Sequence, residues 1–118
     1  MLPHGIAVRK LILSGGDGYC GMKLPKLIKI GALTYDVLKY KFLGEELSGQ
    51  CDSDKQIIRI DDKDADNVVV NTLLHECLHG IYRDRGLIEG DDEERIVAAF
   101  ANGVQALLRD NRDLWKLL

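Results

Sequence analysis

The sequence lacks a long apolar run, an excess of positive charge and a pairable set of cysteines. No apolar stretch approaches the ~20 residues of a membrane-spanning helix, so we expect no membrane partner. Lys and Arg number 16 against 19 Asp and Glu, for a formal net charge of -3. The basic surface typical of nucleic-acid-binding proteins is therefore missing. Three cysteines without metal-binding spacing predict free thiols in a reducing, cytoplasmic compartment rather than a secreted disulfide scaffold.

The composition is that of a small globular protein. The chain has 118 residues, of which 46% are hydrophobic and 30% are charged, enough for one domain with a modest core. Residues 1–21 are glycine-rich and weakly patterned, and their apolar run at residues 11–13 is too short for an export signal. The chain from Met22 onward reads like a natural protein start. We therefore predict a poorly ordered extension over residues 1–21 and a folded domain over residues 22–118.

Residue patterning within that domain predicts strands first and helices afterwards. Four short β-forming runs occupy residues 26–30, 34–40, 47–51 and 56–60, and turn residues 52–55 join the last two as a hairpin. A helix is expected over residues 65–85, where Val69, Leu73, Cys77 and Ile81 recur at i+4 and form an apolar stripe. A second helix is expected over residues 91–108. This order of elements predicts an α+β fold.

The most informative segment is His75-Glu76-Cys77-Leu78-His79, an H-E-x-x-H pentapeptide within the first predicted helix. Helix positions i and i+4 share a face, so His75 and His79 can present two imidazole nitrogens to one metal ion. Glu76 is adjacent and can reach a water molecule at that metal. Two neutral nitrogen ligands beside a carboxylate base are typical of zinc hydrolases. The pentapeptide therefore predicts a zinc (Zn2+) site with Glu76 as the general base, and Cys77 is expected to pack as a small apolar residue.

A catalytic zinc site needs a third protein ligand, and the best candidates begin the second predicted helix. Glu93 and Glu94 would approach the metal if this helix folds back on the first. Helical phase favours Glu93, which falls near the centre of the face that carries Val97, Phe100 and Val104. The alternative role of both glutamates is that of a solvated first turn favoured by the helix dipole.

The motif and its surroundings resemble the gluzincin group of zinc metallopeptidases. More narrowly, the chain is similar to small phage-encoded peptidases near the ImmA/IrrE-like family. The resemblance runs from about Met22 to Leu118, and the segments that carry it are residues 24–31, 49–52 with 58–61, 74–76 and 108–111.

This resemblance implies a minimal zincin-like metallopeptidase domain over residues 22–118, with a small antiparallel sheet packed on the motif helix and a second, C-terminal helix completing the site. It implies that His75 and His79 bind zinc and that Glu76 is the base. The implied third ligand is Glu94, three residues before Val97, which competes with the helical-phase argument for Glu93.

Two functions of different classes follow. The first is a zinc-dependent metallopeptidase that hydrolyses a peptide or protein substrate with a metal-activated water and Glu76 as base. The second is a non-enzymatic, zinc-stabilised phage structural or adaptor module, because metal binding adds directly to the folding free energy of a small domain. An intact Glu76 favours the enzyme, since a purely structural site needs no base. If the chain is phage-encoded, the expected location is the host cell cytoplasm.

Overall fold

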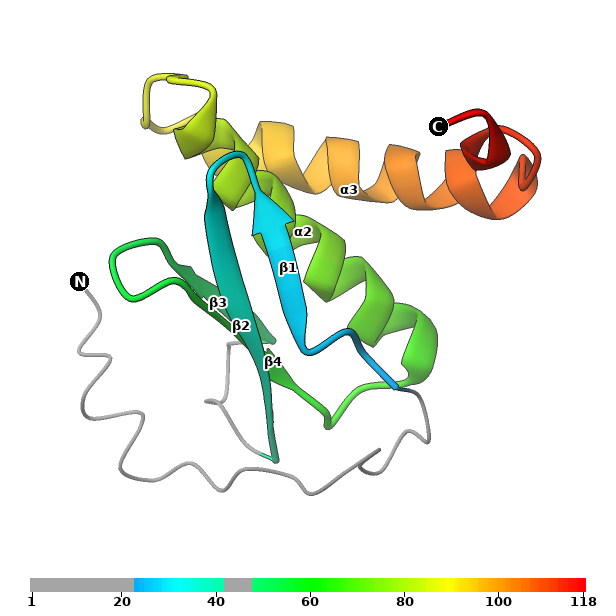
Figure 1. Ribbon diagram of the computed structural model, residues 1–118, viewed down its shortest axis with the longest axis horizontal. Helices are drawn as coiled ribbons and strands as arrows, with labels where there is room; N and C mark the ends of the chain where they lie inside the picture. Colours follow the sequence, from blue (N-terminus) through cyan, green and yellow to red (C-terminus); the bar gives the residue numbers. More distant parts are fainter. Residues whose placement is uncertain (1–22, 42–47) are drawn as a thin grey trace.

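The structure is a computed structural model, and it describes residues 23–41 and 48–118. The expected α+β fold is confirmed, with a sheet followed by two helices along the chain (Figure 1). The elements in order are β1 (Leu27–Ile30), β2 (Leu33–Tyr40), β3 (Gly49–Asp52), β4 (Ile57–Asp61), α2 (Asp66–Asp84), α3 (Glu93–Asp110) and a short 3-10 helix, Trp115–Leu117. Residues 1–21, for which we predicted an extension, and the start of the third predicted strand at residue 47 lie outside the described residues.

The four strands form one sheet in the order β1-β2-β4-β3. β1 and β2 are an antiparallel hairpin whose turn includes Gly31 at φ 61, a backbone conformation that favours glycine. β3 and β4 are the expected second hairpin, in which Asp52 pairs with Ile57. Its turn is closed by a hydrogen bond that the Lys55 backbone N–H donates to the Asp52 carboxylate, 3.0 Å long. The sheet is therefore two hairpins placed side by side.

The expectation of an antiparallel sheet is wrong at the junction between the hairpins. β2 and β4 are parallel, with Asp36 opposite Ile57 and Tyr40 opposite Asp61, so the sheet is mixed. The reason lies in the order of pairing. The chain leaves β2 and enters β3 at the sheet's edge, and the tight turn after β3 then returns β4 alongside β2. Because β4 reverses the direction of β3, it runs in the same direction as β2.

α2 covers one face of the sheet and forms the core with it. Ile58 and Ile60 of β4 are fully buried, and Val69 and Leu73 of α2 pack against them. The buried row along α2 is Val69, Leu73, Glu76 and Gly80, not the expected row that continues through Cys77 and Ile81. A strict i+4 row drifts around a helix of 3.6 residues per turn, so a straight contact with the sheet alternates steps of four and three. Glu76 therefore lies on the side of α2 that faces the sheet.

α3 packs on α2 rather than on the sheet, and extends beyond it (Figure 1). Its buried residues are Val97 and Ala101. Phe100, which we expected on the buried face, is 61% exposed, because the extensive packing of α3 against the described elements is with α2, which covers one side of it. Within residues 23–41 and 48–118, neither helix combines the length and apolar character needed to cross a membrane.

Candidate metal centre

Two histidines one helical turn apart meet on the side of α2 that faces α3. His75 and His79 are both half-buried, and their ring centroids are 4.9 Å apart. Their Nε2 atoms lie 3.2 Å from each other. The i, i+4 spacing in the sequence therefore produces the convergence of imidazole nitrogens that we expected from it.

The first turn of α3 brings a carboxylate to both imidazoles. Oε2 of Glu94 lies 2.7 Å from Nε2 of His75, and Oε1 lies 3.0 Å from Nε2 of His79. His75, His79 and Glu94 form the one group of side chains within the described ranges that could hold a metal ion, with one ligand atom of each within 4.8 Å of the others. Residues that are far apart in the sequence thus offer three donor atoms to one point.

These donors fit a zinc ion in their chemistry, and the two histidines also fit it in their spacing. Imidazole nitrogens and a carboxylate oxygen are the donor types that zinc takes at catalytic sites. Ligands placed tetrahedrally at zinc bond lengths of ~2.0–2.1 Å lie about 3.3 Å from each other. The two Nε2 atoms, 3.2 Å apart, have the separation that a shared ion requires. The Glu94 contacts of 2.7 and 3.0 Å use one carboxylate oxygen each and are shorter, as direct contacts without an ion are. The side chain of Glu94 is 68% exposed, so the group is open to solvent on that side.

Glu93 contacts Nδ1 of His79, whereas the neighbouring Glu94 contacts Nε2 of the same ring. Oε2 of Glu93 lies 2.6 Å from Nδ1 of His79, on the opposite edge of the imidazole from Glu94. The Glu93 side chain is 17% exposed, against 68% for Glu94. The two glutamates that the sequence offered as alternative ligands therefore occupy two distinct positions around one histidine.

Glu76 points into the interface between α2 and β3 and is only 8% exposed. A Cβ added at Gly49, on the edge strand β3, would lie 3.1 Å from Cγ of Glu76. The absence of a side chain at Gly49 therefore makes room for the Glu76 side chain. Burial, opposed by the charge of His79 and reinforced by that of Glu94, raises the pKa of Glu76 to about 7. At neutral pH this carboxyl is therefore near its midpoint, where a group both accepts and donates protons readily.

The two histidines differ in their electrostatics. Burial lowers the pKa of His75 despite the nearby charge of Glu94. Burial also acts to lower the pKa of His79, but the hydrogen bond with Glu93 and the charges of Glu76 and Glu94 outweigh it, so the net direction is upward. The carboxylates therefore concentrate on His79, which is bonded through both of its ring nitrogens.

Cys77 lies inside the pentapeptide but outside the donor group. It is a free, half-buried thiol that packs against the hydrophobic core, in agreement with the expectation from the sequence. Burial, together with the charge of Glu76, raises its pKa to about 11. The thiol therefore stays protonated at neutral pH, whereas a thiol must lose its proton to ligate zinc.

One contributor that we did not anticipate is Gly49. Besides its approach to Glu76, a Cβ at this position would meet Cγ2 of Thr72 at 2.7 Å. A glycine inside a predicted strand is itself a signal for close approach by another part of the protein. That signal was available in the sequence, but it does not say which residue approaches.

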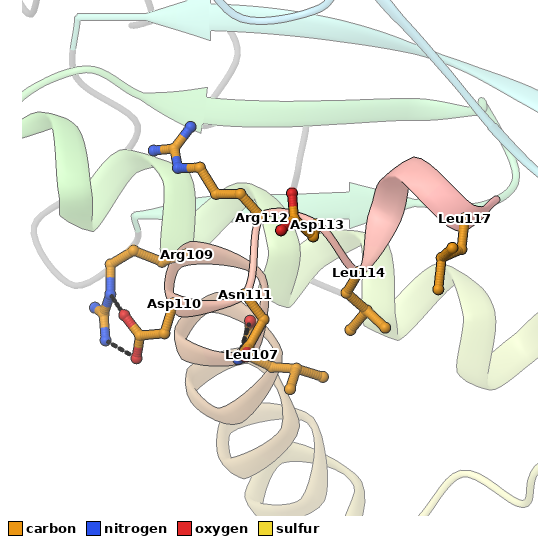
Figure 2. A pocket seen from close by; sticks show the side chains of 8 residues that line it. All are labelled: Leu107, Arg109, Asp110, Asn111, Arg112, Asp113, Leu114 and Leu117. Atoms are coloured by element: carbon orange, nitrogen blue, oxygen red, sulfur yellow. Dashed lines mark hydrogen bonds and ion pairs between the residues drawn. The ribbon is translucent and has the colours of Figure 1, made fainter.

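A separate hollow of about 720 Å³ lies at the other end of α3 (Figure 2). Leu107, Leu114 and Leu117 supply its apolar wall, and Arg109 and Asp110 at its edge are paired with each other at 2.9 Å. Glu93 begins α3 whereas the hollow follows its last turn, so roughly 25 Å of helix separates it from the histidines. The hollow is therefore separate from the His75, His79 and Glu94 group.

Comparison of the chain with family models, with curated proteins and with solved structures found no match. The argument for a function therefore depends on the residues and the geometry described above.

Proposed function

We propose that the protein is a zinc-dependent metallopeptidase. The observation that carries the proposal is the convergence of His75 Nε2, His79 Nε2 and the Glu94 carboxylate beside the buried Glu76. Two histidines and a glutamate from a second helix, with a further carboxylate next to the first histidine, are the parts of a catalytic zinc site of the hydrolase type. The resemblance to gluzincins supports the same conclusion.

The division of roles follows from the position of each side chain. His75, His79 and Glu94 would hold the ion, which when bound supplies a Lewis acid for the scissile carbonyl and lowers the pKa of a water molecule. Glu76 accepts the proton of the attacking water and passes it to the leaving amine. Its pKa of about 7 suits both transfers, because the base form and the acid form are then equally accessible near neutral pH.

A second candidate is the zinc-stabilised module without enzymatic activity, proposed here as a structural or adaptor protein of a phage. The observation in its favour is that α3 joins the rest of the protein through α2, at the interface that the donor group bridges. A metal there would hold the two helices together. Two features favour the enzyme. Structural zinc sites are usually closed by four protein ligands, whereas the donor group here has three members and one of them, Glu94, is exposed. A structural site also needs no buried carboxyl group such as that of Glu76.

The test measures zinc content and hydrolysis of a quenched-fluorescence peptide library by the wild type, Glu76→Gln and Glu89→Gln. Glu89 is a matched control, because its carboxylate is half-exposed, pairs with Arg83 and is not a member of the donor group. We expect about one zinc per chain in all three proteins. Hydrolysis should fall by a factor of roughly 10²–10⁴ in Glu76→Gln alone, since an amide cannot accept the proton.

Three results would overturn the proposal, one through the metal site and two through the enzymatic activity. Full zinc occupancy in both His75→Ala and His79→Ala would refute the metal site. One zinc per chain with no hydrolysis of any peptide, or equal hydrolysis by the wild type and Glu76→Gln, would refute the enzyme. Zinc binding without hydrolysis of any peptide would leave the zinc-stabilised module as the better account.

A further inference from the structure

The hydrogen bond between Glu93 and His79 uses the ring nitrogen that faces away from the donor group. Glu93 Oε2 lies 2.6 Å from Nδ1, while Nε2 of the same ring faces His75 and Glu94. His75 has no corresponding bond at its Nδ1 anywhere in residues 23–41 and 48–118. The support for the two histidines is therefore unequal.

We propose that Glu93 is a positioning residue that accepts the Nδ1–H of His79 and so directs the unprotonated Nε2 into the donor group. This inference rests on the proposed zinc site, because the value of the arrangement is that Nε2 is left free to ligate. Glu93 itself does not ligate the metal in this assignment. It acts through His79, while its neighbour Glu94 is the carboxylate that joins the donor group.

The chemistry of imidazole explains why such a residue is needed. A neutral imidazole carries one N–H, which resides on either nitrogen, and only the nitrogen without a proton can ligate a metal. A carboxylate that accepts from Nδ1–H fixes the proton there and fixes the plane of the ring. It also makes Nε2 more basic and hence a stronger ligand.

The structure also shows why Glu93 suits this role and Glu94 does not. Neighbouring helix positions point about 100° apart, so the first turn of α3 presents one carboxylate to each edge of the His79 ring. The Glu93 side chain is 17% exposed. Its bond to His79 is therefore shielded from competing water, which makes the ring orientation more strictly defined than an exposed contact would.

The test compares Glu93→Ala, Glu93→Gln and Glu94→Ala. Zinc affinity is measured by competition with a chelator, and the imidazole N–H signals of the zinc-loaded protein are followed by ¹H–¹⁵N NMR. We expect Glu93→Ala to keep one zinc per chain but to bind it 10–100-fold more weakly, in line with the loss of other carboxylate partners of metal-bound histidines. Glu93→Gln should recover part of the affinity, since its amide oxygen still accepts from Nδ1–H. Glu94→Ala, which removes a ligand, should have the largest effect.

The NMR signals distinguish positioning from a general structural role. In the wild type the Nδ1–H of His79 should be strongly downfield and slow to exchange with solvent; in Glu93→Ala it should lose both properties. The His75 signal is the internal control and should not change.

An unchanged His79 signal and an unchanged affinity in Glu93→Ala would overturn the inference. So would a loss of affinity equal to that of Glu94→Ala without recovery in Glu93→Gln, because Glu93 would then be a ligand. If the wild type binds no zinc, the proposed function fails separately. The same NMR comparison on the metal-free chain then decides whether Glu93 accepts the Nδ1–H of His79.

Discussion

α2 packs against the sheet on one side and against α3 on the other, and the two interfaces differ in chemistry. On the sheet side, the fully buried Ile58, Ile60 and Val69 form a dry core. On the α3 side, two small residues, Val97 and Ala101, are buried, and much of the remaining contact is polar. The Asn71 side-chain amide, about one helical turn before His75 on α2, donates hydrogen bonds to Asn102 and Gln105 at 2.9 and 2.8 Å.

This difference divides the proposed site into two parts. Glu76, the proposed base, lies on the sheet side, where tight packing fixes its position. The carboxylate of Glu94 comes from α3, whose attachment depends on few buried apolar groups and on polar contacts of modest strength. The donor group therefore spans the weaker interface, and we expect zinc, if it binds as proposed, to add more order to α3 than to the sheet.

The largest expected effect comes from truncating the core on each side of α2. Ile58→Ala should lower the free energy of unfolding by about 2–5 kcal/mol, because it opens a cavity at a fully buried position. Val97→Ala removes less buried apolar surface and should cost about 2 kcal/mol. Urea denaturation measures both, and hydrogen exchange should show the effect of Val97→Ala mainly in α3. An equal loss in the two variants would contradict the comparison between the interfaces.

The pH dependence of metal-free stability tests the burial of Glu76. Its pKa rises from 4.5 in the unfolded chain to about 7 in the folded one, so the folded state binds the proton more tightly. The resulting stabilisation is complete below pH ~4.5 and is lost as pH rises to about 7, by roughly 3 kcal/mol in total.

The measurement compares urea denaturation of the wild type and Glu76→Gln in EDTA between pH 4.5 and 7. The amide does not titrate, whereas the nearby groups His79 and Glu94 remain in both proteins. The stability of the wild type relative to the variant should therefore fall with rising pH. A constant difference would indicate that the Glu76 carboxylate is solvated.

Gly49→Ala tests the close approach of β3 to the Glu76 side chain. The new Cβ would meet Cγ2 of Thr72 at 2.7 Å and Cγ of Glu76 at 3.1 Å, so we expect a loss of about 1–3 kcal/mol. Adding Thr72→Ser removes the nearer methyl group and should restore part of it. Gly103→Ala is the matched control, because nothing lies within 4 Å of its Cβ. It should stabilise α3 by about 0.5–1 kcal/mol. Thermal melts that rank the two alanine variants in the opposite order would refute this packing.

The smallest expected effect concerns the polar contacts of α3. Asn71→Ala removes two hydrogen bonds to α3 and should cost about 1 kcal/mol, with faster amide exchange confined to α3. Asn67→Ala is the control, since Gln105 bonds to the backbone carbonyl of Asn67 and not to its side chain. Equal exchange in the two variants would show that Asn71 does not hold α3 in place.

Local patterns in the sequence predicted the elements well, and long-range choices less so. The strand and helix bounds agree within about two residues wherever the structure describes them, because they depend on turn residues and periodicity within each segment. The parallel pairing of β2 with β4 was not predictable in this way. It depends on which edge of the first hairpin the second one joins, and no residue within either hairpin specifies that edge.

The candidate site shows the same difference between local features, which the sequence predicts, and long-range ones, which it does not. The meeting of His75 and His79 follows from helix geometry alone, so the sequence was sufficient. Helical phase turned Glu93 toward α2, where it lies against His79, and the resemblance selected Glu94, which lies against both Nε2 atoms. Each argument identified one real contact. The separation of their roles depends on the distance between the helices, which the sequence does not express.

The parallel pairing of β2 and β4 also has a consequence for the order of folding. Each hairpin closes a short loop, as when Asp52 meets Ile57, whereas the pairing of Asp36 with Ile57 spans a much longer stretch of chain. Loop closure over a longer stretch costs more entropy and slows the step that requires it. We therefore expect the hairpins to form early and the β2–β4 junction to form in the rate-limiting step. Because Ile58 and Ile60 lie at that junction and pack against α2, truncating them should slow refolding, whereas truncating Val97 on α3 should mainly accelerate unfolding.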